Sequence, residues 1–176
     1  KKEHVIEWKK ITDFVHENSR AKICIQLGHA GRKGSTKAPW VGTNEPLDSD
    51  NWPLISASPI PFDNVNQTPK EMNKSDMDMI VEQFISSTRM SDEAAFDMIE
   101  IHMAHGYLLH EFMSPITNLR NDRYGGTLEN RCRLLVEISK IVRKRWPKIK
   151  CLGARITGSD HLKNGIKEID AIYLAK

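Results

Sequence analysis

Apolar residues recur along the chain in two different patterns, and the two patterns alternate. In the first, apolar side chains return every three or four residues between charged ones, which predicts amphipathic helices. These helices are expected at residues 4–18, from residue 75 onward, at 127–146 and at 167–176. In the second, short and nearly continuous apolar runs predict buried strands, at 22–27, 96–101 and 151–156. This alternation predicts an α/β fold with a parallel sheet.

The second helix carries a capping signal at its start. Ser75 can accept a hydrogen bond from the first turn, and Asp78 follows three residues later. Ile80, Phe84 and Thr88 then fall on one face, which is expected to be buried. The helix is therefore predicted to begin at Ser75.

One connection is unusually long. Residues 28–75 contain six of the eight prolines and no helical pattern. A loop of this length inside a compact domain is typically a functional lid or a small excursion. Short apolar pieces within it, such as 54–60, are expected to pair as hairpin strands.

Composition narrows the class of protein. The 176 residues suit one domain, and 39% apolar with 28% charged residues is typical of a globular protein. A net charge of +3, without a long Lys/Arg block, gives no sign of nucleic-acid binding. No signal peptide and no membrane-length apolar run is present, so the cytoplasm is the expected location. The chain begins with Lys1 rather than Met, as a piece of a longer protein would.

The three cysteines are scattered and odd in number. Cys24, Cys132 and Cys151 form neither a disulfide framework nor a zinc-binding pattern. Cys24 and Cys151 lie within apolar runs, so they are expected to be buried small hydrophobic residues.

Polar residues follow each predicted strand. Parallel α/β folds place ligand sites at the carboxyl ends of their strands. The residues found there are 28–36 after the first strand, 102–107 after the second and 155–160 at the end of the third. A functional site is therefore expected at this end of the sheet.

His102, His105 and Tyr107 are the first candidates for catalysis. Two imidazoles three residues apart can donate to one oxygen atom, and a phenol can deliver a proton. This set suits a carbonyl group whose oxygen gains negative charge during reaction. Two alternatives stay open: a metal site that includes His110, or histidines that only bond backbone carbonyls. No metal is predicted, because the helical motif of zinc peptidases and a clear third ligand are missing.

Gln26 and Arg155 are candidates for cofactor binding. A glutamine amide offers a donor and an acceptor to a ring edge, and an arginine can stabilise a ring that becomes anionic. The alternatives are that Gln26 bonds a neighbouring loop and that Arg155 pairs with a core carboxylate such as Glu100.

Taken together, four segments resemble the Old Yellow Enzyme (NADH:flavin oxidoreductase) family, in order and at plausible spacing. They are Ile25-Gln-Leu-Gly-His-Ala-Gly-Arg-Lys33, the run from Phe96 to Leu109, the run from Ser114 to Arg131 with its Tyr124-Gly-Gly126, and Arg155-Ile-Thr157 with Asp160. Within the family, residues 34–36 and 51–58 most resemble the reductase-like domain of bifunctional aminobenzoyl-CoA or salicylyl-CoA monooxygenase/reductases.

The resemblance implies a (β/α)8 TIM barrel with FMN at its mouth, of which residues 1–176 would supply about strands 3 to 5 with flanking helices. Residues 28–75 would form an excursion over that mouth. Gln26 would bond the flavin pyrimidine edge, and Arg155 would stabilise the reduced flavin. His102 and His105 would bind the substrate oxygen, and Tyr107 would deliver the proton. The FMN phosphate is expected on loops after strands seven and eight, which lie outside this chain.

The implied activity is ene-reduction. NADPH or NADH would reduce the flavin, which would pass hydride to the activated C=C bond of an α,β-unsaturated carbonyl compound, including aromatic CoA thioesters. A dienoyl-CoA reductase with an iron–sulfur cluster would need a cysteine cluster that the chain lacks. The alternative from another class is a non-catalytic remnant or interaction module that holds no flavin. Two open sheet edges would favour a homo-oligomer.

Overall fold

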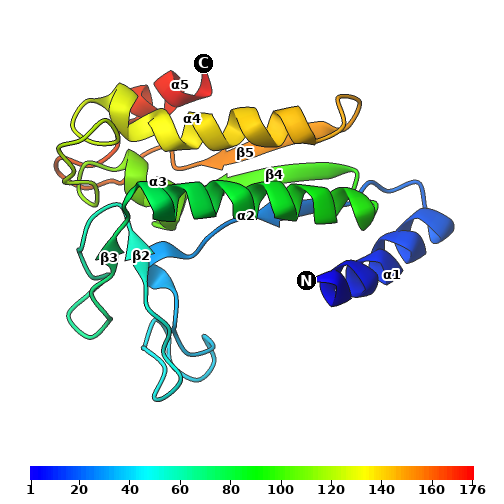
Figure 1. Ribbon diagram of the computed structural model, residues 1–176, viewed down its shortest axis with the longest axis horizontal. Helices are drawn as coiled ribbons and strands as arrows, with labels where there is room; N and C mark the ends of the chain where they lie inside the picture. The colour runs from blue at the N-terminus through cyan, green and yellow to red at the C-terminus, as the bar shows by residue number, and fades with distance from the viewer.

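The computed structural model describes all 176 residues, and its centre is a three-stranded parallel sheet (Figure 1). The strands are β1 (Cys24–Leu27), β4 (Met98–Met103) and β5 (Cys151–Ile156), in the order β1-β4-β5. The register places Gln26 beside Glu100 and His102 beside Arg155. The predicted parallel α/β sheet is confirmed, and β4 is its central strand.

Helices cover one face of this sheet. They are α1 (Lys2–Asn18), α2 (Lys74–Glu93), α3 (Leu108–Met113), α4 (Leu128–Arg145) and α5 (Glu168–Ala175). α2 and α4 run along the strands on the same side of the sheet and contact each other. α1 lies beside the C-terminal end of α2 (Figure 1). The four predicted helices are confirmed, and the short α3 was not predicted. None of the helices is both long and apolar enough to cross a membrane.

Alternation along β4 decides which side chains reach the open face of the sheet. Ile99, Ile101 and Met103 are each at most 1% exposed and belong to the apolar core with α2 and α4. Burying one such side chain stabilises a fold by roughly 1.5–3 kcal/mol. Because neighbouring residues of a strand point to opposite faces, Glu100 and His102 must point away from the helices.

The start of α2 differs from the prediction. Its N-cap is Asn73, whose side chain accepts from the Asp76 N–H while the Asp76 carboxylate accepts from the Asn73 N–H. Ser75 lies inside the first turn, and Asp78 pairs with Lys74. Two overlapping capping patterns therefore compete here. The earlier one forms, because asparagine is a strong N-cap and both reciprocal bonds are made.

The excursion of residues 28–75 holds three short elements, η1 (Gly31–Lys33), β2 (Ile55–Ser56) and β3 (Lys70–Glu71). The predicted hairpin pairing of 54–60 is wrong, because β2 and β3 run parallel. Pro59 and Pro61 follow β2 closely and lack the N–H that a hairpin ladder needs. The chain instead loops through 57–69 and returns in the same direction. An antiparallel bridge joins Thr36 and Pro46 elsewhere in the excursion.

The excursion is fastened to the loop before α4 by Arg120. This side chain is 5% exposed, and its Nη1 donates to the carbonyl oxygens of Ala57 and Met72 at 3.0 and 2.8 Å. Asp122 accepts from the same guanidinium. A buried guanidinium bonded to two separate backbone segments holds the ends of β2 and β3 in place.

The prediction that Cys24 and Cys151 are buried is wrong, because both are exposed. They alternate with the partly buried Ile25 and Leu152, so they lie on the open face with Gln26 and Arg155. Cys132, by contrast, is buried in α4, where desolvation raises the pKa of its thiol to about 11.

Candidate functional site

Gln26, Glu100 and Arg155 meet on the open face of the sheet. Gln26 Nε2 donates to Glu100 Oε1 at 2.5 Å, and Arg155 Nη1 lies 3.9 Å from the same oxygen. The alternative left open for Arg155 is therefore present, since Arg155 pairs with Glu100. Gln26 also bonds Glu100, which lies on the neighbouring strand β4 and not on a neighbouring loop as the alternative for Gln26 had it. The signal for Glu100 was its spacing of two residues from His102, which puts both on one face of a strand.

The free atoms of this trio suit the pyrimidine edge of a flavin. The Gln26 Oε1 atom has no protein hydrogen bond, and the Arg155 side chain is 52% exposed and donates no hydrogen bond. Together they offer an acceptor and several cationic donors. A pyrimidine edge carries one N–H donor flanked by acceptors and becomes anionic on reduction. The residues present therefore fit FMN, with Gln26 and Arg155 as the groups that would hold that edge.

His102 presents a hydrogen-bond donor at the carboxyl end of β4. Its Nδ1 accepts from the Ala104 N–H at 3.1 Å, which assigns the ring proton to Nε2. The residue is 7% exposed. Burial, together with the nearby His105 and Arg155, lowers the pKa of His102 below its ordinary value. At neutral pH the ring is therefore neutral, with one N–H available for a ligand oxygen.

His105 and Tyr107 flank the His102 ring. Each ring centroid lies 5.0 Å from that of His102, with interplanar angles of 82° for His105 and 80° for Tyr107. The structure thus brings the three predicted catalytic residues together at one strand end. Their individual roles stay predictions.

An unusual turn produces this arrangement. His105 and Gly106 are consecutive residues in the left-handed region, with φ of +61° and +73°. Such a conformation is costly for a residue with a Cβ atom. Contacts from other segments hold it: the His105 N–H donates to Thr157 Oγ1 at 3.1 Å, and Lys33 Nζ donates to the His105 carbonyl at 3.0 Å.

A cavity of about 320 Å³ opens in front of the His102 and Tyr107 rings. His102 and Tyr107 line one side, and Lys33 and Trp52 of the excursion line another. Lys33 Nζ lies 5.4 Å from the Tyr107 ring centroid, within cation–π range. Trp52 is 53% exposed, so its indole offers a broad apolar surface.

Glu111 is a buried carboxyl group beneath this cavity, and the sequence analysis missed it. It accepts from the Arg32 N–H at 2.9 Å and from Ser56 Oγ at 2.7 Å. Complete burial raises the pKa of Glu111 from an ordinary 4.5 to about 7. A Cβ atom at Gly31 would lie 2.2 Å from Glu111 Oε1. The carboxyl therefore sets the path of the η1 turn. The available signal was one acidic residue within the apolar run 108–113.

The structure provides no set of ligands for the alternative in which the histidines, with His110, bind a metal ion. His110 uses both ring nitrogens, Nδ1 with the Gly106 N–H and Nε2 with Asp160. No group of three His, Cys, Asp or Glu side chains is placed to hold a metal ion.

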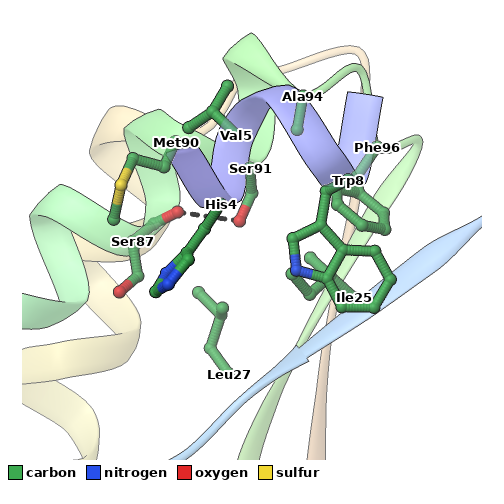
Figure 2. A pocket seen from close by; sticks show the side chains of 10 residues that line it. All are labelled: His4, Val5, Trp8, Ile25, Leu27, Ser87, Met90, Ser91, Ala94 and Phe96. Carbon is green, nitrogen blue, oxygen red and sulfur yellow. Dashed lines mark hydrogen bonds between the residues drawn. The ribbon is translucent and has the colours of Figure 1, made fainter. Parts of the chain in front are cut away.

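A smaller cavity, of about 140 Å³, lies on the helix-covered side of β1 (Figure 2). Side chains from α1, α2 and β1 point into it, and its lining is mostly apolar. Trp8 and Phe96 pack edge to face there, with centroids 5.6 Å apart. This cavity lies between α1, α2 and β1 and shares no residue with the cavity beside His102.

The sequence model of the NADH:flavin oxidoreductase / NADH oxidase family matches residues 1–176. The chain belongs to this family. It is 42% identical over 174 residues to an NADPH dehydrogenase of a Geobacillus species, covering 99% of this chain and 46% of that protein. It is 41% identical over 157 residues to NADH:flavin oxidoreductase FG08077 of Gibberella zeae, covering 86% of this chain and 38% of that protein. The chain thus spans less than half the length of these relatives.

Solved structures of the same architecture confirm the fold. A 2-naphthoyl-CoA reductase complex superposes with a TM-score of 0.85 at 26% identity, covering 99% of this chain and 27% of that one. Histamine dehydrogenase from Rhizobium sp. 4-9 superposes with a TM-score of 0.82 at 23% identity, covering 99% of this chain and 24% of that one. This second likeness supports the fold alone. The chain is therefore part of a TIM barrel, as predicted. The predicted cofactors, FMN with NADPH or NADH, agree with the family and with the names of its relatives.

Proposed function

We propose that the protein is an FMN-dependent ene-reductase that uses NAD(P)H to reduce the activated C=C bond of α,β-unsaturated carbonyl compounds. The observation that carries the proposal is the neutral His102 ring, with its Nε2–H free, which lines one cavity with Tyr107 and packs against the rings of Tyr107 and His105. A donor fixed before the reaction stabilises an oxygen that gains negative charge.

Each residue has a distinct task in this reaction. His102 donates from Nε2 to the substrate oxygen, and His105 supplies the second donor. Tyr107 delivers a proton to the carbon beside the carbonyl group, since a phenol can act as a general acid. Gln26 and Arg155 hold the pyrimidine edge of FMN on the open face of the sheet. When bound, FMN supplies the hydride chemistry between NAD(P)H and the substrate.

An aromatic CoA thioester is the substrate class that we favour within this proposal. The indole of Trp52 lines the cavity and can pack against a flat ring. One structural neighbour is by name a 2-naphthoyl-CoA reductase, in complex with 2-naphthoyl-CoA. We further propose that residues 1–176 act as one domain, with residues 28–75 as its cover over the barrel mouth.

An FMN titration of the purified chain is the first test, followed by flavin fluorescence. Saturable binding, weakened about 10- to 100-fold in Arg155→Ala, supports the proposal, because that variant loses a charge-assisted contact. Arg89→Ala is the matched control, since Arg89 is an exposed helix residue with a 74% exposed side chain. If the chain binds no FMN, a non-catalytic module becomes the better description of residues 1–176.

The proton-donor role of Tyr107 is tested in the FMN-loaded protein. Tyr107→Phe should leave flavin reduction by NADPH within about 2-fold of wild type. It should slow flavin reoxidation by 2-cyclohexenone by roughly 10²- to 10⁴-fold, the usual contribution of a general acid. Equal slowing of both half-reactions would contradict the assignment.

A further inference from the structure

His110 lies directly behind the turn that carries His105 and Tyr107. It belongs to α3, is 8% exposed, and does not line the cavity. Its Nδ1 accepts from the Gly106 N–H at 2.6 Å. The ring therefore bonds the second residue of the left-handed turn and is the only side chain bonded to that amide.

Asp160, from the loop after β5, determines which ring nitrogen of His110 can accept. His110 Nε2 lies 2.8 Å from Asp160 Oδ1. Because Nδ1 is occupied as an acceptor, Nε2 carries the proton and donates it to the carboxylate. The other carboxylate oxygen of Asp160 accepts from Ser114 Oγ at 2.7 Å and from the Ile166 N–H at 2.8 Å.

The His110 ring stays neutral in this setting. Burial lowers the pKa of His110, and the charge of Asp160 opposes that effect only in part. A protonated ring would place a hydrogen on Nδ1 and lose the bond from Gly106. The neutral ring therefore keeps the acceptor that the turn requires.

The geometry of the site depends on this contact. His105 and Gly106 adopt φ of +61° and +73°, and this turn sets the positions of the His105 and Tyr107 rings, each 5.0 Å from the His102 ring. A left-handed residue with a Cβ atom persists only where the surroundings enforce it. The bond to His110 fixes the amide that joins the strained His105 to Gly106.

We propose that His110 is a positioning residue for the proton donor, and that Asp160 holds it in the tautomer that grips the Gly106 amide. This inference rests on the proposed function of the site for its kinetic consequence. The hydrogen bond itself can be tested without any activity.

Two substitutions separate the two ring nitrogens. Asn places its Oδ1 as many bonds from Cα as the histidine Nδ1, so His110→Asn keeps the acceptor for Gly106 and loses Asp160. Gln places its amide at the distance of Nε2, so His110→Gln keeps the contact with Asp160 and loses the acceptor for Gly106. Each variant removes one hydrogen bond, so each is the control for the other in overall stability.

Hydrogen exchange at the Gly106 amide is the first measurement. The amide should remain within about 3-fold of wild type in His110→Asn and exchange about 10-fold faster in His110→Gln, the loss expected for one hydrogen bond. In the FMN-loaded protein, enone reduction should follow the same order, while flavin reduction by NADPH stays within about 2-fold in both. Equal behaviour of the two variants in exchange would overturn the proposal.

Nitrogen-15 NMR of the His110 imidazole in the wild-type protein provides a test that requires no substitution. The spectrum should show His110 protonated at Nε2 and unprotonated at Nδ1. A proton on Nδ1 would overturn the proposal, whether or not the variants fold. Absence of enone reduction in the wild type would refute the proposed function alone, because the exchange and tautomer results stand apart from it.

Discussion

Replacing Glu111 by glutamine is expected to remove a pH dependence from the stability of the protein. The carboxyl group is completely buried, and burial raises its pKa from 4.5 to about 7. Between these two values the folded state holds a proton that the unfolded state has released. Stability therefore falls as the pH rises from about 4.5 to about 7 and stays at the lower level above that range. The difference between the two pKa values corresponds to about 3 kcal/mol.

Urea unfolding, followed by tryptophan fluorescence, measures this effect at pH 5, 6, 7 and 8. Glutamine is nearly the same size and keeps polar atoms near Ser56 and the Arg32 N–H, but it does not titrate. The stability of Glu111→Gln relative to wild type should therefore rise by roughly 2–3 kcal/mol across this range. Other titrating groups are common to both proteins and cancel in the difference.

Two buried histidines and one partly buried histidine also titrate in this range, so the stability of Glu111→Gln must be compared with that of wild type. Burial lowers the pKa of His29, His102 and His110, so the unfolded state binds more protons than the folded state just below pH 6.5. Their contribution to stability rises with pH, opposite in sign to that of Glu111. Glu17→Gln is the matched control, because Glu17 is exposed on α1. A Glu111→Gln curve that runs parallel to wild type within about 1 kcal/mol, which is the usual error of extrapolation to zero denaturant, would refute the reasoning.

Three further substitutions test the site and two backbone turns. His102→Ala should weaken binding of 4-hydroxybenzaldehyde to the FMN-loaded protein by about 10- to 100-fold, since a charge-assisted hydrogen bond is lost; unchanged affinity in a binding titration would contradict the oxygen-gripping role. Gly126→Ala should cost about 1–2 kcal/mol in urea unfolding for its φ of +77°, because no atom lies within 4 Å. Gly31→Ala, at φ +58° and with Glu111 at 2.2 Å, should cost about 1–3 kcal/mol more, and equal costs would show that the carboxyl moves freely.

The parallel sheet could be predicted because its strands have a continuous local signal. β5 begins and ends at the predicted residues, 151 and 156, and α4 begins at Leu128, one residue after the predicted start of that helix at 127. α3 gives no such signal, since all six of its residues are buried and amphipathic periodicity is absent. The parallel pairing of β2 with β3 depends on how residues 57–69 return, which local patterns do not encode.

The candidate site, too, has residues that the sequence could predict and residues that it could not. Five residues could be predicted as site residues from their position, because each one ends or follows an apolar strand. They are His102, His105, Tyr107, Gln26 and Arg155. The groups that hold the site together are joined across long stretches of sequence: Arg32 to Glu111 over 79 residues and His110 to Asp160 over 50. Only the fold brings such partners together, so their tasks had no local signature.

The backbone amide of Ala104 gives the site a chemical polarity. Because this N–H occupies His102 Nδ1, the nitrogen left for a ligand can only donate. A carbonyl or phenolate oxygen satisfies it, whereas an ammonium group or amide N–H would meet a hydrogen already in place. One main-chain hydrogen bond thus makes this position selective for ligand atoms that accept a hydrogen bond over atoms that donate one, whatever the rest of the ligand is.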